Sequence, residues 1–231
     1  MYTSTLSEAH QNFAANFHAD LYDTDNVFVK TVPQLYCTQC QQYLPDRYVE
    51  GTCPHCGNPA KGDSCDHCGK ILEPEDLQNP HCKLCGATPE LRNTKQIYLS
   101  LSRFQTAIQN NLQAKQDQWT HNAIGMTNKY LNEGLVDRAI TRNITWGVPL
   151  PANAEKLLGD ITDKRVYIWA ENVLGYLSAT KAVKPDWEDF LLDSTPTTKR
   201  HYYVHAKDNI PFHSVILPGL LLAENKHQWH L

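Results

Sequence analysis

Residues 37–86 read CTQCQQYLPDRYVEGTCPHCGNPAKGDSCDHCGKILEPEDLQNPHCKLCG and hold all eight cysteines of the 231-residue chain. The cysteines form four Cys-x-x-Cys pairs, a spacing that is typical of thiolate metal sites. Each pair makes a tight turn that points two sulfurs at one ion, and two such turns complete a tetrahedron. The stretch therefore predicts two zinc ions. Their eight expected ligands are Cys37, Cys40, Cys53, Cys56, Cys65, Cys68, Cys82 and Cys85.

The distances between the pairs along the chain predict how they share the two ions. Only eight residues, GNPAKGDS (57–64), separate the second pair from the third, so these two pairs can fold back on each other. We expect a nested arrangement, in which the two inner pairs hold one ion and the two outer pairs hold the other. Sequential pairing is the alternative, and interleaving is the least favoured order. Four thiolates leave no open coordination position, so the predicted zinc is structural.

The residues that follow the cysteines bear on the kind of metal. Gly57, Gly69 and Gly86 follow the second cysteine of three pairs and can supply the positive φ of a knuckle turn. Gln41 takes this place in the first pair, where we expect a less regular turn. An iron–sulfur cluster would use the same ligands, but the cysteine–glycine order favours zinc. Four disulfides in a secreted protein are a further interpretation, which the paired spacing disfavours.

Composition narrows the class of protein. The hydrophobic content of 41% is enough for one large domain or two modest ones, and the net charge of −4 offers no general basic field for nucleic acid. The longest apolar stretch, residues 215–223, is too short to span a membrane and contains Pro218 and Gly219. The N-terminal MYTSTLSEAHQNF has no basic start and no apolar core. We therefore expect no membrane partner and a cytoplasmic protein.

Apolar periodicity predicts the elements on either side of the cysteine-rich stretch. Thr5-x-x-Glu8 is a capping box before an apolar repeat of helical spacing, and residues 27–32 resemble a strand that Pro33 ends. Beyond the cysteines we expect a strand, and then two helices of which the second ends near Gly134. These three elements cover residues 95–100, 101–112 and 119–134.

The last third of the sequence alternates between short apolar runs and helical patterns. Residues 166–169 and 202–205 resemble strands, and each is followed by a helical pattern. This order favours a parallel α/β sheet, and such sheets bind ligands at the carboxyl ends of their strands. Trp169 and His205 stand at those ends.

Six segments, taken in order, resemble methionyl-tRNA synthetase, a class I aminoacyl-tRNA synthetase. The resemblance covers essentially the whole chain. The segments are YCTQCQQYLPDRYVEGTCPHCG (36–57), CDHCG (65–69), CKLCGATPELR (82–92), DRAITRNITWGVPLP (137–151), VYIWAENVLGYLSAT (166–180) and HAKDNIPFHSVILPGLLLA (205–223).

The resemblance implies an α/β fold with a partial Rossmann-like catalytic domain and an inserted zinc-knuckle domain. It divides the chain into an entry helix and strand (1–35), a double zinc-knuckle insertion (36–90), a further connective region (91–160) and a second-half catalytic segment (161–231). It implies methionine, ATP with magnesium, and tRNA as partners of the complete enzyme. Because the 231 residues contain neither a HIGH-like nor a KMSKS-like run, we expect a fragment that is inactive alone.

The family's functional residues transfer to several positions. Trp169 and Tyr176 match aromatic positions around the methionine side chain, where rings suit a thioether, and His213 matches a histidine of the same pocket. Arg142 matches an arginine important for activation, where a guanidinium can hold an anionic group. The alternatives are ordinary core residues for the first three and a salt bridge for Arg142.

Other positions are matched less closely. Lys207 and Asp208 stand where nucleotide contacts are expected. Asn172 and Val173 stand in the expected pocket wall, within Ala-Glu-Asn-Val where relatives often have Asp-Ala-Pro or similar. Asn143 follows Thr-Arg where an aspartate is frequent.

A second hypothesis is a zinc-ribbon module that binds nucleic acid or protein and catalyses nothing. The cysteine-rich stretch alone fits it. The acidic net charge and the pocket segments of the last third do not.

Overall fold

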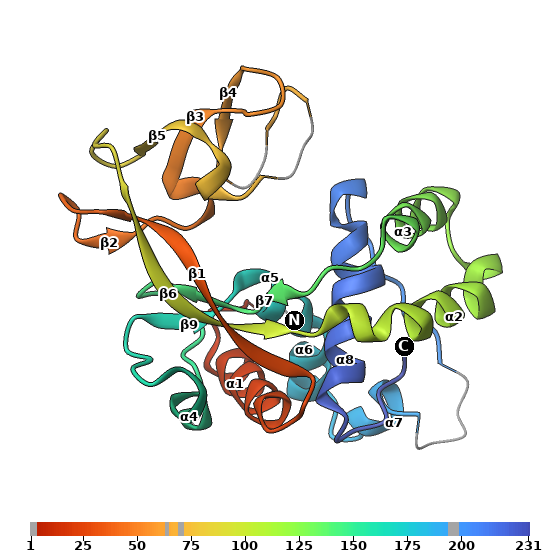
Figure 1. Cartoon of the computed structure of the whole chain (residues 1–231). Coiled ribbons are helices and arrows are strands. Elements are labelled where there is room, and N and C mark those ends of the chain that lie inside the picture. The colour runs from red at the N-terminus through yellow and green to blue at the C-terminus, as the bar shows by residue number, and fades with distance from the viewer. Residues whose placement is uncertain (1–3, 63–64, 69–71, 194–198) are drawn as a thin grey trace.

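The computed structural model describes residues 4–62, 65–68, 72–193 and 199–231, without the side chain of Asp208 (Figure 1). The strands of this part are β1 (Val27–Cys37), β2 (Gln42–Tyr43), β3 (Val49–Thr52), β4 (Pro59–Lys61), β5 (Gln78–Cys82), β6 (Glu90–Leu99), β7 (Arg138–Ala139), β8 (Thr141–Asn143) and β9 (Lys164–Val166). They form sheets of order β2-β1-β6-β7, β4-β3-β5 and β8-β9.

The helices of the described part are α1 (Glu8–Tyr22), α2 (Gln105–Lys115), α3 (His121–Glu133), α4 (Glu155–Leu158), α5 (Ile168–Glu171), α6 (Gly175–Val183), α7 (Trp187–Leu191) and α8 (Leu217–Glu224). A π-helical segment, Phe212–Ile216, leads into α8. Short 3-10 turns are η1 (Asp46–Tyr48), η2 (Pro74–Asp76), η3 (Leu101–Phe104), η4 (Gln116–Gln118), η5 (Ala152–Ala154), η6 (Asn172–Leu174) and η7 (Lys207–Asn209). No helix in these ranges combines the length and the apolarity needed to cross a bilayer.

A long two-stranded ribbon carries the cysteine-rich stretch away from the helices. β1 and β6 pair antiparallel from Val27 opposite Leu99 to Tyr36 opposite Glu90. The sheet β4-β3-β5 lies at the far end of this ribbon (Figure 1). It has a small core of its own, built from aliphatic side chains such as Leu44 and from cysteines. We call residues 36–90 the zinc arm.

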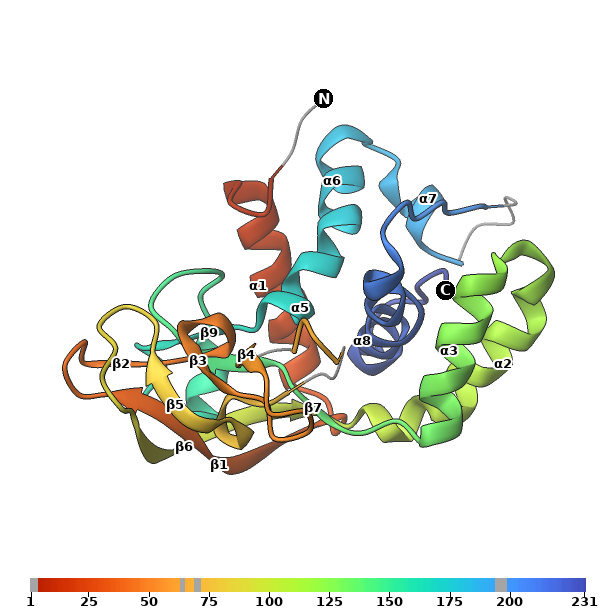
Figure 2. The same cartoon turned by 90° about the horizontal axis from the view of Figure 1, so that it is seen from above.

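The larger core lies among the helices. α8 is apolar nearly all round and buried, as expected for a central helix. α1 and α6 flank it on one side and α2 and α3 on the other (Figure 2). α1 is fixed to the neighbouring helices by a buried polar contact: His10 Nε2 lies 2.7 Å from a Glu171 carboxylate oxygen, and His10 Nδ1 lies 2.9 Å from Ser178 Oγ.

The mixed α/β composition is confirmed, but the expected parallel strands are wrong. The strand pairs of the described residues are antiparallel. The strand expected over residues 166–169 ends at Val166, the last residue of β9, and α5 starts at Ile168. Residues 202–205 form no strand, because a strand needs a hydrogen-bonded neighbour and no backbone of the described residues bonds to theirs.

Two predicted boundaries also shift. β1 continues through Pro33 to Cys37. β2 pairs only with Tyr36 and Cys37, so Pro33 lies at an open edge, where a residue without an N–H is tolerated. α1 begins two residues later than the capping box suggests, because Ser7, not Thr5, caps the helix, with its Oγ accepting the N–H of His10.

Candidate metal centres and candidate substrate site

The zinc arm gathers its cysteines into two groups of four. The outer pairs form one group, with Sγ–Sγ distances of 3.4 Å for Cys37–Cys85 and 3.9 Å for Cys40–Cys82. The inner pairs form the other, at 3.8 Å for Cys53–Cys68 and 3.6 Å for Cys56–Cys65. This is the nested grouping that the sequence predicts.

The sulfur positions fit a tetrahedral ion. A zinc–sulfur bond of about 2.3 Å gives a tetrahedron with edges of about 3.8 Å, and the observed distances of 3.4 to 3.9 Å lie close to this value. The two groups consist of cysteine alone. Either group could therefore hold zinc through four sulfurs, with no position left for a substrate.

Knuckle turns bring the sulfurs of each pair together. The N–H of Gly57 donates to Cys53 O at 3.0 Å, and that of Gly86 donates to Cys82 O at 2.8 Å. Both glycines have the expected positive φ, 71° and 76°, whereas Gly69 lies outside the described residues. Gln41 has a φ of 51°. The first turn thus reaches the same left-handed region, but with a side chain that disfavours it.

Hydrogen bonds prepare one thiol for metal binding. The backbone N–H of Asn58 and then its side-chain amide, 3.5 Å from the sulfur, lower the pKa of Cys56 to about 6. The thiolate is the form that binds a metal, so these donors favour the ligand state at neutral pH.

Tyr176 and His213 form the centre of an aromatic cluster at the start of α6 and α8. His213 Nδ1 donates to Asn209 O at 2.8 Å, since a carbonyl can only accept. His213 Nε2 lies 2.9 Å from the Tyr176 hydroxyl and, in the neutral ring, accepts a hydrogen bond from it. Burial lowers the pKa of His213, so the ring is neutral at pH 7. This chain of hydrogen bonds fixes both rings in one orientation.

Two further rings, those of Tyr203 and His205, pack against this pair, and Trp169 and Phe212 form a stack of their own. Trp169 stacks on Phe212, with ring centroids 3.7 Å apart and planes at 10°. Tyr203 packs edge-on against Tyr176 at 5.1 Å. His205 stacks on His213 at 4.1 Å. The sequence analysis did not single out Phe212 or Tyr203 as site residues. Phe212 directly precedes His213, and Tyr203 lies two residues before His205.

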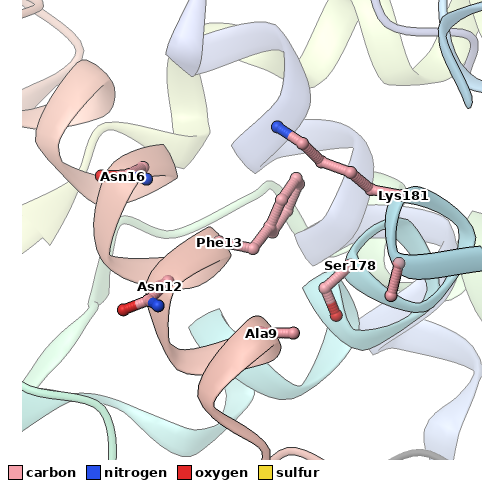
Figure 3. A pocket seen from close by; sticks show the side chains of 7 residues that line it. Ala9, Asn12, Phe13, Asn16, Ser178 and Lys181 are labelled. Atoms are coloured by element: carbon pink, nitrogen blue, oxygen red, sulfur yellow. The ribbon is translucent and has the colours of Figure 1, made fainter. Parts of the chain in front are cut away.

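The remaining predicted pocket residues lie apart from one another. Asn172 is exposed and lines a cavity of about 220 Å³ together with Tyr176, His10 and residues 4–5. Val173 instead packs into the core. A second cavity, of about 210 Å³, lies between α1 and α6 beside Phe13 (Figure 3). None of the predicted site residues lines it.

Arg142 lies at the root of the zinc arm. Its guanidinium carbon is 4.1 Å from the centroid of the Tyr167 ring. Burial opposes its charge, but Tyr167 and the arm residues Asp46 and Glu73 outweigh this effect and raise the pKa of Arg142. Arg142 therefore interacts with the zinc arm, while Tyr176 and His213 interact with residues 203–213.

For the two residues predicted to contact the nucleotide, the structure gives the position of the backbone. Lys207 and Asp208 belong to the turn η7, which precedes the segment of His213. Lys207 is exposed. The side chain of Asp208 lies outside the described part of the structure.

Comparison with known proteins identifies what this arrangement is similar to. The family described as "tRNA synthetases class I (M)" matches residues 1–230. A methionine–tRNA ligase of Bacillus cereus (strain AH187) is 46% identical over 229 residues, and one of Alkaliphilus oremlandii is 43% identical over 224 residues. These alignments cover 96% and 95% of this chain. The chain spans about 40% of the length of either relative.

Solved structures of low sequence identity share the fold. The crystal structure of Mycobacterium tuberculosis methionyl-tRNA synthetase bound by methionyl-adenylate superposes with a TM-score of 0.58 at 15% identity. It covers 97% of this chain, which corresponds to 38% of that protein. The apo form of the same enzyme gives a TM-score of 0.57.

Proposed function

The chain belongs to the methionine-type class I tRNA synthetases, and from that premise we propose that it supplies the methionine-binding segment and the zinc-braced arm of a methionine–tRNA ligase. The complete reaction has two steps. The carboxylate of methionine attacks the α-phosphate of ATP, which gives methionyl-adenylate and releases pyrophosphate. The methionyl group then passes to a hydroxyl of the terminal ribose of tRNA, and AMP leaves.

The Tyr176–His213 pair carries this proposal. Its two hydrogen bonds hold a neutral imidazole and a phenol ring at fixed positions. Trp169 and Phe212 add a stacked pair of flat apolar surfaces nearby. A methionine side chain, unbranched and with a polarisable sulfur, packs well against such rings. A neutral His213 places no charge beside that apolar side chain.

Other residues take supporting roles in the proposal. The Arg142 guanidinium is suited to hold an anionic group during activation. Lys207 and Asp208 contact the nucleotide, with magnesium accompanying ATP. Two zinc ions, each held by four thiolates, give the arm its stability and take no chemical step. Reduced thiols in these sites suit the cytoplasm, where we place the protein.

A polypeptide of these 231 residues alone is expected to form no methionyl-adenylate. It lacks HIGH-like and KMSKS-like runs, and it spans about 40% of its relatives. Pyrophosphate exchange above background by the purified zinc-loaded chain would contradict this expectation.

A graft tests the function. The chain replaces the matching region of the Bacillus cereus relative, and methionine-dependent ATP–pyrophosphate exchange and tRNA methionylation are measured. We expect activity with methionine, and a KM for methionine at least about tenfold higher for His213→Ala, a loss of about 1.4 kcal/mol of binding.

The matched control is His55→Ala, which removes an exposed histidine of the zinc arm and is expected to leave KM unchanged. A folded, zinc-loaded graft that is inactive with methionine, or that activates another amino acid instead, would refute the proposed function.

A further inference from the structure

Two buried histidines of α1 hold the short helix that carries Trp169. His18 Nε2 donates to the carbonyl oxygen of Ala170 at 3.2 Å. His10 Nε2 donates to a carboxylate oxygen of Glu171 at 2.7 Å, since a carboxylate can only accept. Both histidines lie on the buried side of α1, and neither is more than 2% exposed. They therefore grip two consecutive residues of α5.

The same network reaches the helix that carries Tyr176. His10 Nδ1 lies 2.9 Å from Ser178 Oγ, which also donates to Gly175 O at 3.1 Å. Gly175 and Ser178 stand on either side of Tyr176 in the first turn of α6. Figure 3 shows Ser178 facing α1 from α6. His10 and Tyr176 also line the same cavity of about 220 Å³. One side chain of α1 thus contacts the supports of both rings.

α5 cannot set the direction of the Trp169 ring by itself. It has four residues, Ile168–Glu171, and a helix of a single turn has little stability of its own. Its orientation therefore depends on contacts with other elements. The Trp169 ring stacks on Phe212, and α1 supplies the two histidine hydrogen bonds to the residues that follow Trp169.

The polar character of these contacts points to orientation as their role. Burial lowers the pKa of His18 to about 4, so its ring is neutral at pH 7 and its contact with Ala170 is a directional hydrogen bond. Apolar side chains of similar volume often replace a buried ion pair such as His10–Glu171 without loss of stability. Apolar burial is non-directional, however, and does not fix the angle between two elements.

We propose that His10 and His18 are positioning residues of the methionine site, which hold α5 and α6 so that Trp169 and Tyr176 meet the methionine side chain at fixed angles. The inference rests on the proposed function. Loss of the network should weaken the binding of methionine. It should leave the binding of ATP, which is proposed for η7, nearly unchanged.

An apolar swap of the buried pair separates position from stability. In the graft of this chain into the Bacillus cereus relative, His10→Leu is combined with Glu171→Met. The urea midpoint of unfolding should stay nearly unchanged. The KM for methionine should rise at least about fivefold, with kcat and the KM for ATP within about twofold of the wild type.

Leu112→Ala is the matched control, because it lowers stability away from the network. It truncates a buried side chain of α2, on the other side of α8 (Figure 2), and should lower the urea midpoint without changing the KM for methionine.

Two milder variants divide the network. Ser178→Ala breaks the link to α6 alone and should raise the KM for methionine about threefold; it carries the test if the swap does not fold. His10→Gln keeps an amide that can donate to Glu171, and should raise the KM less than the swap does.

The zinc-loaded chain of 231 residues gives a readout that needs no activity. The indole N–H signal of Trp169 in NMR is assigned by its absence in Trp169→Phe. This signal should shift in the swap variant and keep its position in Leu112→Ala.

A folded swap variant that keeps the wild-type KM for methionine, or the wild-type Trp169 signal, would overturn the inference. So would an unchanged KM in Ser178→Ala. An equal rise in KM for Leu112→Ala would do the same, because loss of stability alone would then explain the effect. A folded but inactive wild-type graft would overturn the proposed function and this inference with it, whereas an active graft that is indifferent to the swap would overturn this inference alone.

Discussion

Replacing Asn143 by aspartate is expected to stabilise the protein at pH 7, because Asn143 partners the buried Lys164, whose ammonium contacts no carboxylate among the described residues. Lys164 is 7% exposed, and its ammonium lies 2.9 Å from Asn143 Oδ1 and 2.8 Å from Thr94 Oγ1. Asn143 Oδ1 also accepts from Gln96 Nε2 at 2.6 Å and from Thr94 Oγ1 at 2.9 Å. Three donors converge on one oxygen, an environment that suits a carboxylate.

The cost of this burial follows from the pKa of Lys164. Burial lowers it from 10.5 to about 8, against the weaker opposing effect of Asp160 and Asp163. The difference corresponds to about 3 kcal/mol at pH values below 8, where the ammonium is charged in both states. Between pH 8 and 10.5 the unfolded chain binds more protons than the folded one, so the free energy of unfolding rises with pH through that window.

An aspartate at position 143 would face the Lys164 ammonium at hydrogen-bond distance and favour its charged form. The folded pKa of Lys164 should return to its ordinary value or higher. Because the new carboxylate has a desolvation cost of its own, we expect a net gain of about 1 to 3 kcal/mol at pH 7. The rise in stability between pH 8 and 10.5 should disappear in the variant.

Urea unfolding of the zinc-loaded protein at pH 7, 9 and 10.5 measures both effects. Asn93→Asp makes the same substitution at an exposed position of β6 and should change stability by less than about 0.5 kcal/mol. If Asn143→Asp is no more stable than the wild type at pH 7, or keeps the alkaline rise, then the lysine is not the source of the penalty.

Three further substitutions test other parts of the structure. His10→Ala should lower the free energy of unfolding by about 3 to 5 kcal/mol, because it leaves the buried Glu171 carboxylate unpaired. Urea unfolding of the double variant with Glu171→Gln should show part of that stability restored, and no restoration would count against this reason. Gln41→Gly should raise the stability of the zinc arm by about 1 kcal/mol, because φ is 51° there, and thermal unfolding that shows no gain would contradict this. Glu224→Ala should cost about 1.5 to 3 kcal/mol, because its buried carboxylate accepts the indole N–H of Trp229 at 2.9 Å; an unchanged Trp229 indole N–H signal in NMR would argue otherwise.

The cysteine grouping could be predicted from the sequence because it depends on short-range geometry. The segment 57–64 is short, which favours folding of the two inner pairs onto one ion. α3 was predictable for the same reason, since its apolar repeat ends at Gly134, whose φ of 84° terminates the helix. The aromatic pocket residues came from the family resemblance. The structure brings Tyr176 and His213 into contact and stacks Trp169 on Phe212, and their role in binding methionine stays a prediction.

What sequence patterns missed depends on neighbours far along the chain. Residues 202–205 have the propensity of a strand but no neighbour to pair with in the described structure. Pro33 continues a strand because its outer edge is open. The partners of Lys164 come from Thr94 and Asn143, 70 and 21 residues away, and no local pattern indicates such a buried network.

The metal content of the purified chain tests the central claim most directly, since we propose that each of the two sulfur groups of the arm holds a zinc ion. Elemental analysis and zinc X-ray absorption should give two zinc ions per chain, each with four sulfur ligands at about 2.3 Å. A chain that binds no zinc and has its cysteines joined in disulfides would contradict the account, as would iron in place of zinc.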